Sequence, residues 1–165
     1  MTTHDFHRGL TTLLRELTYG AAPPGGYVLN VGDAGLLASL DRLTADDASS
    51  SAHGGATIAA HVDHVTYGLS LMNRWAAGED PFGTADWAAA WQTNRVAEVE
   101  WAGLRRALKE QVDRWLIAIA EPRELADVEL NGVLASVAHL AYHLGAIRQI
   151  HAGLRGPKEG SPQGL

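Results

Sequence analysis

The residues best suited to chemistry in this sequence are histidines, of which there are eight. His139 and His143 lie four residues apart within an apolar stretch. On an α-helix this spacing separates two side chains by about 40° around the axis and about 6 Å along it, so both imidazoles can reach one metal ion. The pair predicts a divalent-metal site, although a lone histidine on an apolar helix face is more often a hydrogen-bonded core residue.

A second apolar stretch, residues 57–77, carries His61 and His64. His61 falls near the centre of its apolar face and His64 toward one edge, so the helical wheel does not choose between them as a third ligand. Three imidazoles on one ion would leave a coordination position open for water or substrate. No role at this site is predicted for His4, His7, His53 and His151.

Helical periodicity dominates the segments that must position these histidines. We expect helices over residues 3–18, 34–43, 57–77 and 130–154. Asp86 can cap a further segment that begins at Trp87 and leads into a long helix, which stops at Pro122. Residues 44–55 should form a loop, and the only strand-like run is Tyr27-Val28-Leu29. The pattern predicts an all-α four-helix bundle with a short extra helical segment.

Composition limits the possible partners. The 165 residues carry a net charge of -6, with no concentration of Lys or Arg, so neither nucleic acid nor an anionic membrane is an expected partner. There are no cysteines, which removes disulfides and thiolate ligands. The apolar stretch 133–147 is too short to span a bilayer, and the N-terminus lacks a signal-peptide pattern. We therefore expect a cytoplasmic domain over residues 1–155 and a flexible tail over 156–165.

Two segments resemble motifs of the DinB/YfiT-like superfamily. Residues 57–64, TIAAHVDH, resemble the motif of its second helix, and residues 139–150, HLAYHLGAIRQI, resemble that of its last helix. The second match combines the histidine pair with a following small-residue and Arg-Gln-Ile context. The resemblance covers about residues 1–155.

The resemblance implies an up-down-down-up four-helix bundle, often dimeric, with one histidine ligand from the second helix and two from the last. It assigns the metal ligands to His64, His139 and His143, and leaves His61 as a neighbouring or pocket residue. The implied cofactor is a divalent ion, Zn, Ni, Fe or Mn, with Zn or Ni favoured. A homodimer is the implied assembly.

Three functions fit these features. The first is a metal-dependent hydrolase or a thiol-dependent transferase or isomerase that acts on a small molecule with a low-molecular-weight thiol as cosubstrate. For such an enzyme, Asp63, Glu98 and Glu100 are candidate general bases by residue type alone.

The second function is a non-catalytic, metal-stabilised binding or stress-response module. The third is a structural dimer without metal, in which tryptophans such as Trp87, Trp91 and Trp101 line the interface. Core packing or a ligand pocket would explain the same tryptophans equally well.

Overall fold

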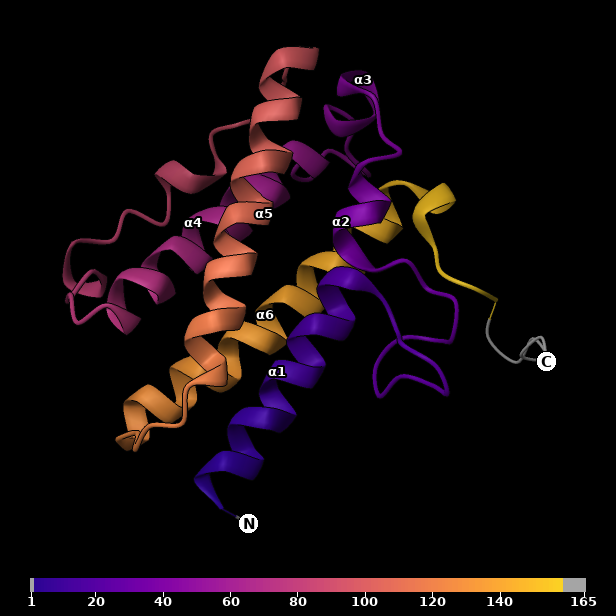
Figure 1. Cartoon of the computed structure of the whole chain (residues 1–165). Helices are drawn as coiled ribbons and strands as arrows, with labels where there is room; N and C mark the ends of the chain where they lie inside the picture. The colour runs from indigo at the N-terminus through magenta and orange to yellow at the C-terminus, as the bar shows by residue number, and fades with distance from the viewer. Residues whose placement is uncertain (1, 159–165) are drawn as a thin grey trace.

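Four long helices form the body of the protein, and the computed structural model describes them within residues 2–158. They are α1 (Thr3–Tyr19), α4 (Ile58–Ala76), α5 (Glu98–Ala120) and α6 (Asp127–Ile150) (Figure 1). The short elements are α2 (Gly35–Leu40), α3 (Ala45–Ala48) and the 3-10 turns η1 (Phe82–Thr84), η2 (Ala89–Trp91) and η3 (Ala152–Leu154). No strand occurs among residues 2–158, so the all-α prediction is confirmed.

The helices pack so that α1 and α4 each contact both α5 and α6. In Figure 1, α1 and α6 rise from the lower end of the bundle, whereas α4 and α5 descend from the upper end. The connection between α1 and α4, which includes α2 and α3, carries the chain around the upper end. This arrangement sets α4 beside α6, the two helices that carry the four histidines of interest.

Local signals in the sequence explain where the helices begin and end. Thr2 and Asp5 form a reciprocal capping box at the start of α1, and Thr57 accepts a hydrogen bond from the Ala60 N–H at the start of α4. α1 stops at Gly20, whose φ of 98° is in the left-handed region. A Cβ on Gly20 would lie 2.2 Å from the Asp33 carbonyl oxygen, so only glycine fits this turn.

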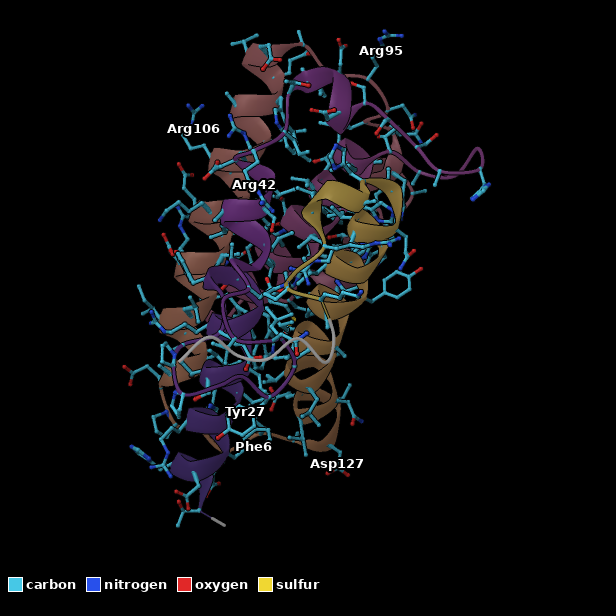
Figure 2. All side chains as sticks on the ribbon, turned by 90° about the vertical axis from the view of Figure 1, so that its right-hand side faces the viewer. Phe6, Tyr27, Arg42, Arg95, Arg106 and Asp127 are labelled. Atoms are coloured by element: carbon cyan, nitrogen blue, oxygen red, sulfur yellow. The ribbon has the colours of Figure 1, made fainter. Side chains whose placement is uncertain are left out.

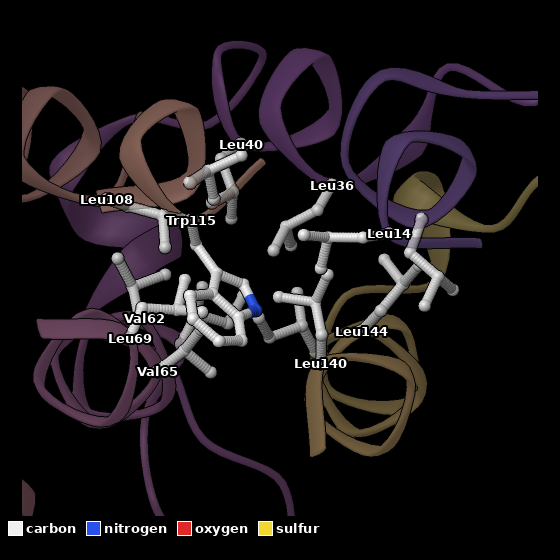
Figure 3. Packing of buried hydrophobic residues seen from close by; sticks show 14 of the residues in the cluster. Leu14, Leu36, Leu40, Val62, Val65, Leu69, Leu108, Trp115, Leu140 and Leu144 are labelled. Atoms are coloured by element: carbon white, nitrogen blue, oxygen red, sulfur yellow. The ribbon is translucent and has the colours of Figure 1, made fainter. Parts of the chain in front are cut away.

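The core lies between all four long helices and is filled mainly by leucine and valine, which surround Trp115 (Figure 3). Trp115 is fully buried, and its indole N–H donates to Ser136 Oγ at 3.0 Å, which ties α5 to α6. His7 ties α1 to the end of α5, because its Nδ1 lies 2.9 Å from the Ile119 carbonyl oxygen. Charged side chains such as Arg95 and Arg106 point away from the bundle (Figure 2).

Two expected elements differ from the structure in the first half of the chain. Residues 44–55 were expected to form a loop but contain α3, which begins at a capping box formed by Thr44 and Asp47. The run Tyr27-Val28-Leu29 forms no strand. Its three backbone N–H groups donate to the buried Glu16 carboxylate at 2.9, 2.7 and 2.6 Å, so a side chain takes the place of a partner strand.

The segment expected to begin at Trp87 is separate from the long helix that follows it. Asp86 does accept a hydrogen bond from the Ala89 N–H, but the chain makes only the 3-10 turn η2 before α5 begins at Glu98. Contacts with α4 explain the break, because the aromatic side chains of this segment pack against histidines of α4. The last helix begins three residues before the expected residue 130, at Asp127, and ends at Ile150 ahead of η3.

α6 is long and apolar enough to cross a membrane by length and composition, a property that buried helices of globular domains share. Its buried face packs against α1 and α4. Of the predicted flexible tail, only residues 156–158 lie within the described part of the chain. There the Pro157 carbonyl oxygen accepts a hydrogen bond from Asn30 at 3.3 Å.

Candidate metal centre

Three imidazoles meet between α4 and α6. His139 and His143 project from successive turns of α6, and His64 faces them from α4. The Nε2 atom of His139 lies 2.9 Å from Nε2 of His143 and 3.1 Å from Nε2 of His64. One nitrogen from each of the three residues lies within 4.8 Å of the other two. We call these three residues the histidine cluster.

Hydrogen bonds among the three imidazoles cannot account for all of these short nitrogen–nitrogen distances. A neutral imidazole has one N–H donor and one nitrogen lone pair, each pointing in a single direction in the ring plane. The Nε2 of His139 faces two other Nε2 atoms and can make a good hydrogen bond with only one of them. A cation at the centre would accept all three lone pairs.

The spacing of the nitrogens fits a metal ion. Two nitrogen ligands at about 2.1 Å from one Zn²⁺, at angles between octahedral and tetrahedral values, lie about 3.0–3.4 Å apart. The observed distances of 2.9 and 3.1 Å lie just below and just above the lower limit of this range. All three nitrogens lie within 4.8 Å of one another, so the cluster could hold a metal ion.

The environment keeps the imidazoles in the form that binds metal. Burial, followed by the neighbouring imidazoles His139 and His61, lowers the pKa of His143 to about 3 and that of His64 to about 4. Burial also lowers the pKa of His61 and of His139. These four imidazoles are therefore neutral at pH 7, and a metal would not have to displace protons from charged side chains.

His61 contacts the histidine cluster through His143. Its Nδ1 lies 2.8 Å from Nδ1 of His143, on the opposite side of that ring from the convergent Nε2 atoms. If Nε2 of His143 offers its lone pair to the cluster, its Nδ1 carries the proton and donates to His61. The structure thus places His64 within the cluster and His61 as a hydrogen-bond partner of His143.

The connection between α4 and α5, residues 77–97, covers the cluster. Trp91 stacks on the His64 ring with 4.1 Å between ring centroids, and Trp87 lies 5.7 Å from the same ring. The connection is fastened to α4 because Tyr67 Oη accepts a hydrogen bond from the Asp86 N–H at 2.9 Å. Spacing gave no sign that these tryptophans would lie over the histidines, since the contact depends on how the connection folds back.

The role of Trp101 differs from that of Trp87 and Trp91. Trp101 is fully buried, and its indole N–H donates to the Leu43 carbonyl oxygen at 2.9 Å. It therefore belongs to the core. Trp87 and Trp91 instead form the surroundings of the histidine cluster.

A cavity of about 360 Å³ opens beside the cluster between α4 and α6. His64 and His139 lie in its wall, together with apolar side chains such as Leu69 and Met72. A larger hollow of about 670 Å³ runs between α1 and the loop that follows it, but none of the three cluster histidines lines it. The smaller cavity is therefore the space in which a ligand could approach the cluster.

The three carboxylates considered as general bases are engaged elsewhere. Asp63 accepts a hydrogen bond from the Thr93 hydroxyl, Glu98 accepts one from the Ala45 N–H at 2.9 Å, and Glu100 accepts one from the Ala97 N–H at 2.7 Å. None of them lines the cavity. These contacts are structural, and they indicate no general base for a reaction in the cavity.

The chain matches no protein-family model, no curated protein and no solved structure. The interpretation of the site therefore depends on its own geometry and chemistry.

Proposed function

We propose that this protein binds one divalent metal ion through Nε2 of His64, His139 and His143 and uses it in a thiol-dependent transfer or isomerisation. The observation that carries the proposal is the convergence of three neutral imidazole nitrogens in a buried position next to a cavity. Imidazole ligands suit Zn, Ni and Fe better than Mg or Ca, and Zn or Ni is the favoured ion.

The ligand set determines the charge of the site. Three neutral imidazoles leave the full +2 charge of the ion uncompensated, whereas a carboxylate ligand would remove part of it. A bound ion would supply Lewis acidity, lowering the pKa of a thiol or water molecule beside it. The role of His61 is to accept the Nδ1–H of His143 and so to hold that ring in the orientation and tautomer that the ion needs.

The absence of a carboxylate in the cavity wall favours thiol chemistry over hydrolysis. A free thiol has a pKa near 8.5, far below that of water, and so loses its proton without a strong base from the protein. Hydrolysis would depend more on a general base, and no described carboxylate lines the cavity. Because the sequence contains no cysteine, the thiol would come from a low-molecular-weight cosubstrate.

Membership of the DinB-like superfamily is part of the proposal. The first supporting feature is the origin of the cluster histidines, because one comes from α4, the second long helix, and two come from α6, the last. The directions of α1, α4, α5 and α6 also follow the up-down-down-up order that the resemblance implies (Figure 1). A homodimer in the cytoplasm that acts on a small molecule, and not on nucleic acid or a membrane, belongs to the same proposal.

The position of the histidine cluster between two helices also favours a non-catalytic function. The histidine cluster joins α4 to α6, and each candidate base is occupied by a structural hydrogen bond. A metal at the cluster would then act as a crosslink that stabilises the bundle, as in a non-catalytic binding or stress-response module.

Turnover in the presence of thiols distinguishes the two functions. We expect metal-loaded protein to accelerate the reaction of a low-molecular-weight thiol with an electrophile such as 1-chloro-2,4-dinitrobenzene, and the rate to fall to background in His64→Ala. The control is His4→Ala, which removes an exposed histidine outside the cluster. Metal-loaded protein without turnover toward any thiol and electrophile pair would support the non-catalytic module.

A further inference from the structure

The cavity beside the histidine cluster has a distinct composition. Among the described residues, the side chains of its wall include no Asp, Glu, Lys or Arg. Apart from His64, His139 and the indole of Trp87, its only polar side chain is that of Ser136, which already accepts from Trp115 and donates to the Val133 carbonyl oxygen. The wall therefore offers mainly apolar contact and the two imidazoles, with no described cationic side chain to pair with a carboxylate.

The cavity also has a size and shape suited to part of a small molecule. Its volume of about 360 Å³ is at the lower end of the roughly 300–1,000 Å³ typical of ligand sites. Phe82 and Trp87, from the α4–α5 connection, form one wall and are 43% and 42% exposed. Leu69, Met72 and Leu140 form the buried part. An aromatic rim above an apolar interior is an arrangement that favours a flat or branched hydrocarbon group.

The geometry points to this cavity as the binding site for an uncharged aryl or alkyl group of the second substrate, the electrophile. This inference rests on the proposed metal-dependent function for its chemistry but not for the binding itself. A group in the cavity would place its reactive end toward His64 and His139, where the cluster lies. A thiol cosubstrate that carries carboxylates would bind outside the cavity, since no described cationic side chain lines it.

Desolvation explains the choice between an uncharged and a charged occupant. A carboxylate moved into this wall would lose its hydration and gain no cationic partner among the described side chains. An apolar group loses little and gains about 25 cal/mol for each Å² of surface that it buries. Of two ligands of equal shape, the uncharged one should therefore bind more tightly.

Two glycines of α6 provide matched variants. Gly132 lines the cavity, and a Cβ there would meet no atom within 4 Å, so Gly132→Leu would fill the space without displacing the backbone. Gly145 lies on the same helix outside the cavity, and its Cβ would likewise meet nothing. Both substitutions raise helix propensity, so Gly145→Leu controls for the added leucine.

The test measures binding of 4-nitrobenzyl alcohol and 4-nitrobenzoate, which share a ring and differ in charge, by quenching of tryptophan fluorescence in metal-free protein. We expect saturable binding of the alcohol, at least tenfold weaker binding of the benzoate, at least tenfold weaker binding of the alcohol to Gly132→Leu, and no change in Gly145→Leu. Equal binding of both probes, or no effect of Gly132→Leu, would overturn the inference. If Gly132→Leu does not fold, Ala135→Leu, at a cavity position one turn along α6, replaces it.

The same experiment separates this inference from the proposed function. Metal content is measured on each protein sample. A sample that never takes up metal but discriminates between the probes as expected would refute the metal proposal and leave the binding site in place. A sample that binds metal but shows no saturable binding of the alcohol would refute the binding site and leave the metal proposal in place.

Discussion

Replacing His61 by leucine tests whether its hydrogen bond to His143 orients that ring for metal binding. The Nδ1 of His61 lies 2.8 Å from Nδ1 of His143, the only hydrogen-bond partner of that ring nitrogen among the described residues. Leucine would keep the apolar bulk of this buried position and remove the acceptor. Losing the partner that orients a metal-bound histidine typically weakens metal binding about 10–100-fold, or roughly 1.4–2.7 kcal/mol.

The matched variant is His61→Asn. The side-chain oxygen of asparagine is attached to Cγ, as Nδ1 of histidine is, so it can accept the same Nδ1–H of His143. We expect the affinity for Zn²⁺, measured by competition with a chromophoric chelator, to fall 10–100-fold in His61→Leu. In His61→Asn it should stay within a few-fold of the original value.

Two outcomes would refute this reasoning. Unchanged affinity in His61→Leu would show that the hydrogen bond does not orient His143. Complete loss of metal in both variants, with full binding in His64→Ala, would show that His61 is itself the third ligand and that the side chains rearrange by one helical turn on binding.

Three further predictions concern stability, each measured by urea unfolding. Without metal, the free energy of unfolding should fall as the pH drops below 6.5, because His143 has a pKa near 6.5 when unfolded and about 3 when folded, so the unfolded chain binds the additional proton. For His143 alone the loss between pH 6.5 and 5 is about 1.6 kcal/mol, and a flat profile over that range would contradict it. Glu16→Gln should cost about 3 kcal/mol, since it replaces a carboxylate that accepts three backbone N–H bonds, whereas the exposed Glu110→Gln should cost almost nothing. Leu140→Ala, at a fully buried position between the cluster and the core, should cost about 2–5 kcal/mol, and a cost no greater than that of the half-exposed Leu134→Ala would show that the core is not packed as described.

Short-range spacing accounts for the parts of the site that the sequence predicts well. His139 and His143 share one face of one helix because they are four residues apart, and that relation needs no knowledge of the fold. The choice between His61 and His64 has a different origin. They are also nearly one turn apart, so which of them meets His139 depends on how α4 is rotated against α6. Only the packing of the bundle decides that rotation.

Long-range contacts account for what sequence patterns missed. The run of alanines near Trp91 favours a helix by propensity, but stacking on His64 and the anchor at Tyr67 hold the segment along α4. Glu16 binds a loop more than ten residues away, and no periodic signal reveals such a contact. The capping box of Thr44 and Asp47 is, by contrast, a local signal, but it begins a helix of four residues, which is too short to show a periodic pattern.

The central claim is that His64, His139 and His143 together bind a metal ion. The most direct measurement is elemental analysis of protein purified without a histidine tag, before and after incubation with Zn²⁺ and removal of excess ion. We predict about one metal per chain, lost in His143→Ala and retained in His4→Ala. Metal content near zero that incubation does not raise would contradict the account and leave the cluster as a structural contact between α4 and α6.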